Sequence, residues 1–346
     1  MNVLHIYDDA TGGATVAMES VASCVGGSMQ PLQQPVLSHR AICTVGGYCH
    51  PGRRLWIRGA LRMHKPDIVH LHNFKHAGTA AIAACKDAGI PVVWSCYDYW
   101  CLGPHDIGND WSWATYRPVN RTAPRILNLA LIGRQRRMRR WFNQLDAIVT
   151  LSKHSMGMLL WAGITRPAYH VVPLPVTVPR RLAEWESDDT FEPTRNPNLV
   201  LYVGGHSAHK GWGVWRKVVE LLQAGDPWPA CLSIHKATRS QSLGEIARAT
   251  CLVVPEIWPN PGPVVIAEAQ LLGTPVVASN IGGIPEMHPT FLAKHDSPED
   301  FAAKVRNALA MGGHSADLAR IEATRRHDPA TIRQQFLEVY RSCVSR

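Results

Sequence analysis

Short apolar runs and amphipathic stretches alternate along most of the chain. Asn2 to Tyr7 (NVLHIY) is apolar, and Gly12 and Gly13 follow it before a helical stretch. Asn198 to Gly205 (NLVLYVGG) begins a second series in much the same way. Strands that alternate with helices are typical of parallel sheets covered by helices. The pattern therefore predicts an α/β protein with two halves, each of which starts with a strand, a glycine turn and a helix.

The boundary between the two halves is marked by a change in composition. Arg180 to Asn198 is charged, lacks periodicity and has prolines near its end, which is typical of a linker. The 346 residues are enough for two domains of about 150 residues each. We therefore predict domains at 1–175 and 176–328, followed by a terminal helix at 329–346 in which Pro329 takes the first position.

The stretch from Pro255 to Glu286 (PEIWPNPGPVVIAEAQLLGTPVVASNIGGIPE) combines a turn, a helix, a strand and a second glycine turn. Its loop ends would lie along one edge of a sheet, where open α/β sheets bind ligands. The prolines delay the helix until after Pro263, and Gly273 closes it. One carboxylate, Glu268, lies among the apolar residues of this helix. A buried charge needs a ligand hydroxyl or a cation as partner, whereas the alternative is a solvated helical glutamate.

This stretch resembles the nucleotide-sugar site of retaining, metal-independent GT-B glycosyltransferases of family 4, also called glycosyl transferases group 1. Their pattern is a Glu, seven residues, a second Glu, then GTPVVAS and GG-x-PE. Glu268 matches the second Glu, and Asn260 occupies the position of the first. The resemblance implies that Glu268 holds the nucleotide ribose, while the backbone around Gly262, Pro263 and Val264 faces the donor sugar and its diphosphate. Asn260 keeps a hydrogen-bonding side chain without the charge.

Two further segments resemble donor loops of the same family. HSAHKGW follows Gly205 as the family's G-R-x-x-x-x-K-G loop follows its strand, so Lys210 would neutralise the β-phosphate. Gly205 replaces the usual Arg, and Lys210 could instead be an ordinary solvated lysine. Near the N-terminus, a strand, a glycine turn and a helix start form an anion site, or merely a connection. The family places Gly12 and Gly13 against the donor diphosphate.

The first half carries the segments that the family uses on the acceptor side. In IVHLHN, His70 and His72 point to one face of a strand, and without a third ligand at suitable spacing they predict no metal site. The family has HLHN in its acceptor cleft, which favours His72 as an acceptor contact. CYDYWCLGP resembles the family's LHDYW-x-x-C/G-P loop, with Tyr97 in place of a histidine at the reaction centre. Tyrosine can donate a hydrogen bond but is no acid or base near neutral pH.

The same resemblance assigns roles in that loop and beyond it. Asp98 and Trp100 match the family pattern, so the expected catalytic residues are Lys210, Asp98 and Tyr97, and Trp100 is expected at the acceptor. A helix from about 127 to 145 has an apolar stripe and an arginine-rich remainder. Its arginines are either solvated or face anionic lipids or a lipid-diphosphate acceptor. Arg134 lies within the apolar stripe and is a candidate acceptor contact.

Composition limits the remaining possibilities. The net charge of +9 and a pI near 9.2 favour anionic partners. Nine cysteines without a CxxC pair or a Cys/His cluster indicate a reducing compartment and no structural metal. We find no signal peptide and no apolar run that approaches a membrane span. The expected location is therefore the cytoplasm, with the protein either free or peripheral on the inner face of the membrane.

Together these features predict a GT-B enzyme in which two Rossmann-like domains face each other across a cleft and the last helix crosses back to the first. It would move a hexose from a nucleoside diphosphate sugar to a glycan or lipid-linked acceptor, with retention, in cell-surface polysaccharide synthesis, without a cofactor. A weak nucleotide-sugar-binding protein or partner subunit is the alternative, because Tyr97, Gly205 and Asn260 all depart from the pattern. A nucleic-acid-binding protein ranks last because no recognition motif accompanies the basic charge.

Overall fold

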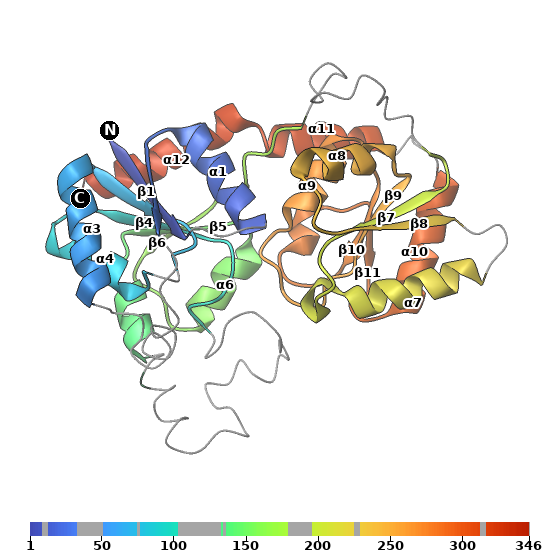
Figure 1. Ribbon diagram of the computed structural model, residues 1–346, viewed down its shortest axis with the longest axis horizontal. Coiled ribbons are helices and arrows are strands. Elements are labelled where there is room, and N and C mark those ends of the chain that lie inside the picture. The colour runs from blue at the N-terminus through green and yellow to red at the C-terminus, as the bar shows by residue number, and fades with distance from the viewer. Residues whose placement is uncertain are drawn as a thin grey trace. The chain divides into compact units, whose positions relative to one another are not determined.

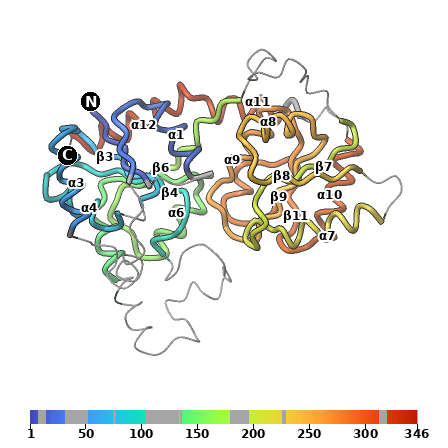
Figure 2. Tube along the Cα trace, viewed as in Figure 1, coloured from blue at the N-terminus to red at the C-terminus, as the bar shows by residue number. Residues whose placement is uncertain are grey.

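The chain forms two compact units in the computed structural model, which describes residues 1–8, 13–32, 51–74, 77–102, 133, 136–178, 196–224, 229–311 and 316–345. The first unit comprises Met1–Pro175 together with Ala330–Arg346, and the second comprises Val176–Pro329. Figure 1 shows that each unit contains a sheet with helices on both of its faces. In Figure 2 the red C-terminal trace runs among the blue and cyan elements of the first unit.

The first unit is built on a sheet with strand order β2-β1-β3-β4-β5-β6, in which all paired strands are parallel. The strands are β1 (Val3–Asp8), β2 (Ser28–Leu32), β3 (Ile68–Leu71), β4 (Val92–Cys96), β5 (Ala147–Thr150) and β6 (Ala168–Val171). The helices are α1 (Gly13–Val25), α3 (Pro51–His64), α4 (Thr79–Asp87), α6 (Lys153–Trp161) and α12 (Pro329–Val344). Strands β3, β4 and β5 are buried throughout, as expected for a parallel sheet covered on both faces.

The second unit has strand order β11-β10-β9-β7-β8, again with parallel pairs. Its strands are β7 (Leu199–Val203), β8 (Ala230–Ile234), β9 (Cys251–Val254), β10 (Val276–Ser279) and β11 (Phe291–Ala293). Its helices are α7 (Trp212–Gln223), α8 (Arg239–Arg248), α9 (Val264–Leu271), α10 (Pro298–Met311) and α11 (Ala316–Arg326). The predicted pair of Rossmann-like parallel sheets is therefore confirmed.

Packing in the second unit separates into two layers of side chains, one on each face of the sheet. Helices α7 and α10 cover one face, with Trp215, Val218 and Phe301 in that layer. Helices α8 and α9 cover the other face, where Ile246 and Ile266 pack on the strands. Burial of these apolar side chains fixes the sheet, so that the loops at its carboxyl edge have a rigid support.

Local signals in the sequence set several of the helix ends. The side chain of Ser152 accepts a hydrogen bond from the Ser155 amide and caps α6, a position that serine favours. Gly273, at φ 71°, ends the turn after α9, as predicted. Helices α3 and α11 were not predicted. Among the described helices, none is both long enough and apolar enough to span a bilayer.

Candidate functional site

The second unit brings three loops together at the carboxyl edge of its sheet. They follow β7, β9 and β10, which are neighbours in the sheet, and the strand order reverses between β9 and β7. Backbone hydrogen bonds join the middle loop to both others: the Ile257 amide donates to the His209 carbonyl at 3.1 Å, and the Gly283 amide donates to the Asn260 carbonyl at 2.8 Å. In open α/β sheets such a reversal is where ligands bind.

Two glycines allow these loops to approach one another. Gly211 has φ 75°, and a Cβ there would lie 1.7 Å from the Pro255 carbonyl oxygen. Gly282 has φ 63°, and a Cβ there would lie 2.5 Å from the Pro259 carbonyl carbon. Other residues are strained at these backbone angles and would collide with the loop after β9. The glycines of the KG and GG motifs therefore serve loop packing.

A buried carboxylate lies between the loops after β7 and β9. The Lys210 ammonium contacts Glu256 Oε1 at 2.6 Å, and the Asn260 amide Nδ2 donates to Glu256 Oε2 at 2.6 Å. The Glu256 side chain is 4% exposed, whereas that of Lys210 is 34% exposed. From the sequence, Glu256 was set aside because its register differs from the family pattern, although its position two residues after the buried strand β9 was a signal.

The side-chain oxygen of Asn260 also has a hydrogen-bond partner. Its Oδ1 accepts a hydrogen bond from the Gly262 amide at 3.0 Å. One of the backbone amides expected to face a diphosphate therefore already has a partner within the loop. Pro263 immediately precedes α9 and Val264 is its first residue, so the backbone around them forms the N-terminal end of that helix, as predicted.

Glu268 lies in α9 and is 7% exposed. Arg239 Nε donates to its Oε1 at 3.0 Å, and Arg239 also donates to the Thr177 carbonyl. Burial raises the pKa of Glu268, and the nearby guanidinium opposes that rise. The argument that this buried charge needs a partner is met by a cation from α8. Sequence reasoning missed Arg239, although the Thr238 capping box fixes the start of its helix.

Four further residues predicted for the donor or acceptor sites fall in different places. Gly205 is exposed, and its carbonyl accepts a hydrogen bond from the Tyr202 hydroxyl at 2.7 Å. Gly13 is the first residue of α1. Gly12 and Arg134 lie outside the residues that the structure describes.

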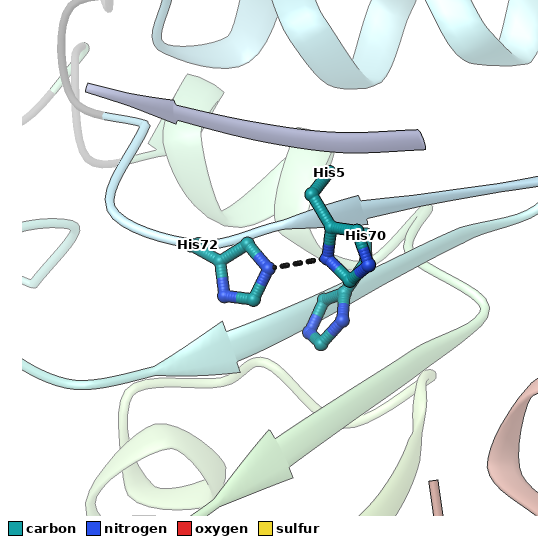
Figure 3. A group of neighbouring side chains, drawn as sticks. All are labelled: His5, His70 and His72. Carbon is teal, nitrogen blue, oxygen red and sulfur yellow. Dashed lines mark hydrogen bonds between the residues drawn. The ribbon is translucent and has the colours of Figure 1, made fainter. Parts of the chain in front are cut away.

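In the first unit, three histidines from two neighbouring strands meet in the core. His5 on β1 pairs in register with His70 on β3, and His72 directly follows β3. His72 Nε2 lies 2.8 Å from His5 Nδ1, and Figure 3 marks this contact with a dashed line. His72 Nδ1 lies 2.9 Å from the Tyr97 hydroxyl. All three histidines are completely buried. His72, which was predicted to contact the acceptor, is thus a completely buried side chain that is hydrogen-bonded to Tyr97.

These histidines are also the group that could hold a metal ion among the described residues. The expectation that no third ligand joins His70 and His72 is wrong, because strand register brings in His5. His70 contacts the Tyr340 hydroxyl at 2.7 Å and the Ser95 hydroxyl at 2.8 Å, and His5 Nε2 contacts the Gly26 carbonyl at 3.1 Å. Since every ring nitrogen of the trio has a partner, a metal would have to replace existing hydrogen bonds.

The trio predicts that stability depends on pH. Burial lowers the pKa of His5 from 6.5 to about 4 and lowers those of His70 and His72 well below 6.5. The unfolded chain therefore binds more protons than the folded chain at mildly acidic pH. Stability is full above pH 6.5 and should fall as the pH drops toward 4, by up to about 1.4 kcal/mol per pH unit for each histidine.

Guanidinium unfolding of the whole chain at pH 7.0, 6.0 and 5.0 measures this dependence. His64, at the end of α3 and hydrogen-bonded to Gln30, lies outside the trio, so its exchange for glutamine provides a control that leaves the trio intact. Equal free energies of unfolding at pH 7.0 and 5.0 would contradict the prediction.

Asp98 and Trp100 follow Tyr97 in the turn after β4. Trp100 is 3% exposed and packs edge-on against Phe74 and Phe142. Asp98 Oδ1 accepts a hydrogen bond from the Trp100 amide at 3.2 Å. Trp100, predicted at the acceptor, is thus a core aromatic residue, and Asp98 shapes the turn that follows β4.

Two stretches of the chain match models of glycosyltransferase families. Residues 34–180 match the model for Glycosyltransferase Family 4, and residues 239–311 match that for Glycosyl transferases group 1. No curated protein matches the sequence.

Several solved structures share the fold over nearly the whole chain. Anabaena Alr3699/HepE in complex with UDP and glucose has 16% identity and a TM-score of 0.69, covering 99% of this chain and 100% of that chain. Sucrose-phosphate synthase from Thermosynechococcus elongatus has 13% identity and a TM-score of 0.69, covering 100% of both chains. The UDP-forming α,α-trehalose-phosphate synthase from Burkholderia vietnamiensis has 12% identity and a TM-score of 0.66, covering 99% of this chain and 100% of that chain.

Proposed function

This chain is a glycosyltransferase of the GT-B fold with family 4 and group 1 regions, and on that premise we propose that it transfers a hexose from a nucleoside diphosphate sugar to a glycan or lipid-linked acceptor. The observation that carries the proposal is the placement of Lys210 and Glu268 in the second unit. Lys210 follows β7 at the reversal of strand order, and Glu268 lies in the helix that follows the neighbouring loop.

In this proposal Lys210 stabilises the charge that grows on the leaving diphosphate. Its side chain is partly exposed and its ammonium is bonded to Glu256, so a positioned charge is available for electrostatic catalysis. The Glu268 carboxylate, kept ionised in part by Arg239, would accept hydrogen bonds from the ribose hydroxyls. We further propose that no metal ion is needed, because Lys210 supplies the positive charge, and that the reaction retains the anomeric configuration, as the resemblance to retaining enzymes suggests.

The acceptor side of the proposal draws on the first unit and on its basic helix. Arg136, Arg137, Arg139 and Arg140 are exposed while Met138 and Phe142 are buried, so the segment is amphipathic with a cationic outer face. Such a face suits anionic lipid headgroups. We therefore propose a cytoplasmic enzyme that works at the inner membrane surface in polysaccharide synthesis. Co-sedimentation with vesicles containing phosphatidylglycerol, but not with phosphatidylcholine vesicles, would support this.

A thermal-shift panel tests the donor class. UDP-, GDP- and ADP-sugars are each compared with the free nucleotide, and a ligand at one hundred times its Kd should stabilise the protein by about 2.7 kcal/mol. UDP compounds are the first choice, since the solved Anabaena structures hold UDP or UDP-glucose. A panel in which no nucleotide or nucleotide sugar shifts the melting temperature would remove the proposal.

Glu268→Gln should weaken UDP binding about 10-fold or more, because the neutral amide accepts weaker hydrogen bonds from hydroxyl groups and leaves Arg239 without its carboxylate. Isothermal titration calorimetry measures the change. Glu220→Gln on the exposed side of α7 is the matched control and should bind UDP as the wild type does. Unchanged UDP affinity in Glu268→Gln would show that this carboxylate serves only its ion pair.

A nucleotide-sugar-binding protein without transferase activity remains the second candidate. Tyr97, Gly205 and Asn260 all differ from the family pattern, and Tyr97 contacts a completely buried histidine. Tight UDP-sugar binding with neither transfer nor donor hydrolysis would favour this second function over the first.

A further inference from the structure

Glu256 has two partners that come from different loops. Its Oε1 lies 2.6 Å from the Lys210 ammonium and its Oε2 accepts from the Asn260 amide at 2.6 Å. With its side chain only 4% exposed, this carboxylate is withdrawn from water, which is costly unless both oxygens are satisfied. The two contacts meet that requirement.

Each contact also restricts a residue of the candidate donor site. Lysine side chains have many rotamers, and a short charge-assisted bond to a buried group limits where the Lys210 ammonium can lie. Because Asn260 donates through Nδ2 to Glu256, its Oδ1 faces the other way and accepts from the Gly262 amide. One carboxylate therefore orients the cation and the turn before α9.

A purely structural role, in which the ion pair fastens the two loops, is less well supported. These loops already have the bond between His209 and Ile257 and the close approach at Gly211. Asn260 is separately bonded through its carbonyl to Gly283. Backbone contacts alone therefore join the loops, and the charge of Glu256 is not needed for their packing.

We propose that Glu256 is a positioning residue for sugar transfer, which supplies from position 256 the carboxylate that the chain lacks at position 260. It holds the Lys210 ammonium in place for the diphosphate and offsets part of its charge, so that the nucleoside diphosphate product is bound less tightly and released. The inference rests on the proposed function of the same site.

Glu256→Gln tests the role of the charge. The amide side chain has nearly the same shape, but it frees the ammonium from its carboxylate. UDP binding measured by calorimetry should tighten roughly 3- to 10-fold, because the diphosphate no longer meets a competing negative charge. The turnover number should fall roughly 10-fold or more, because the ammonium is no longer held. Glu245→Gln, which removes the carboxylate of the Glu245–Arg248 pair on α8, should change neither quantity.

A second pair of variants separates charge from reach. Glu256→Asp keeps the charge but is one methylene shorter, so turnover should fall while UDP affinity does not tighten. In a Lys210→Met background, Glu256→Gln should no longer tighten UDP binding, since the effect acts through the ammonium. The Asp variant remains informative if the Gln variant does not fold.

Opposite changes in UDP affinity and turnover would support a positioning role. Parallel losses of both, or a tightening that persists without Lys210, would overturn it. If the wild-type protein binds UDP and Glu256→Gln matches it in both measurements, this inference fails and the proposed function stands. If the wild type binds no nucleotide at all, the proposed function itself fails.

Discussion

Replacing Lys210 with methionine is expected to lower the turnover number for sugar transfer by about 10²- to 10³-fold, the usual effect of removing one preorganised group that stabilises developing charge. Methionine keeps much of the length and apolar stem but has no ammonium. The Glu256 carboxylate would also lose its cation while remaining buried. Steady-state kinetics with the donor identified in the thermal-shift panel measure the change in turnover. Calorimetric titration with UDP measures how far the substitution also weakens nucleotide binding.

Lys217 provides the control for this substitution. It lies on α7, in the same unit, and is exposed to solvent. Lys217→Met should leave turnover within about twofold of wild type, since exposed charges away from a site contribute little. If Lys210→Met keeps full turnover with every donor tested, Lys210 plays no part in the reaction.

Gly211→Ala is expected to destabilise the protein by about 2–5 kcal/mol, the sum of left-handed backbone strain and overpacking. The backbone at Gly211 has φ 75°, and the added Cβ would fall 1.7 Å from the Pro255 carbonyl oxygen. That atom belongs to the backbone and cannot rotate away, so the loop after β9 must move. Denaturant unfolding measures the loss of stability, and UDP affinity should fall with it because Lys210 and Glu256 flank the contact.

Gly213, two residues further along, is the matched control. It lies in the first turn of α7, and a Cβ built there meets nothing within 4 Å. Gly213→Ala should therefore be neutral or stabilise the protein by up to about 1 kcal/mol, because alanine loses less backbone entropy in a helix. Equal stabilities of the two alanine variants would argue against a tight contact between the loops.

The fold was predictable because its signals are local. An apolar run such as Asn198 to Gly205 and a closing glycine such as Gly273 carry their structural meaning within a few residues. The same holds for the capping side chain of Ser152. Since strands alternate with helices along most of each unit, parallel sheets are the expected result.

The candidate site was only partly predictable, since its contacts join distant parts of the chain. Glu256 meets Lys210 across 46 residues, and Arg239 meets Glu268 across 29. His5 reaches His72 across 67 residues through the register of two strands. Sequence spacing does not encode such register or the direction of a loop. The family pattern expects its first carboxylate at position 260, so it did not single out Glu256.

The buried histidines also determine which way hydrogens point at Tyr97. The Gly26 carbonyl has no hydrogen to give, so His5 must donate to it through Nε2 and receive at Nδ1. His72, neutral because burial lowers its pKa, must then donate to His5 and receive at Nδ1 from the Tyr97 hydroxyl. Because the Tyr97 hydroxyl donates its hydrogen to His72, its oxygen can accept a further hydrogen bond but cannot donate one. Any further group that meets the Tyr97 oxygen must therefore bring a hydrogen, as the hydroxyl of Ser95 can.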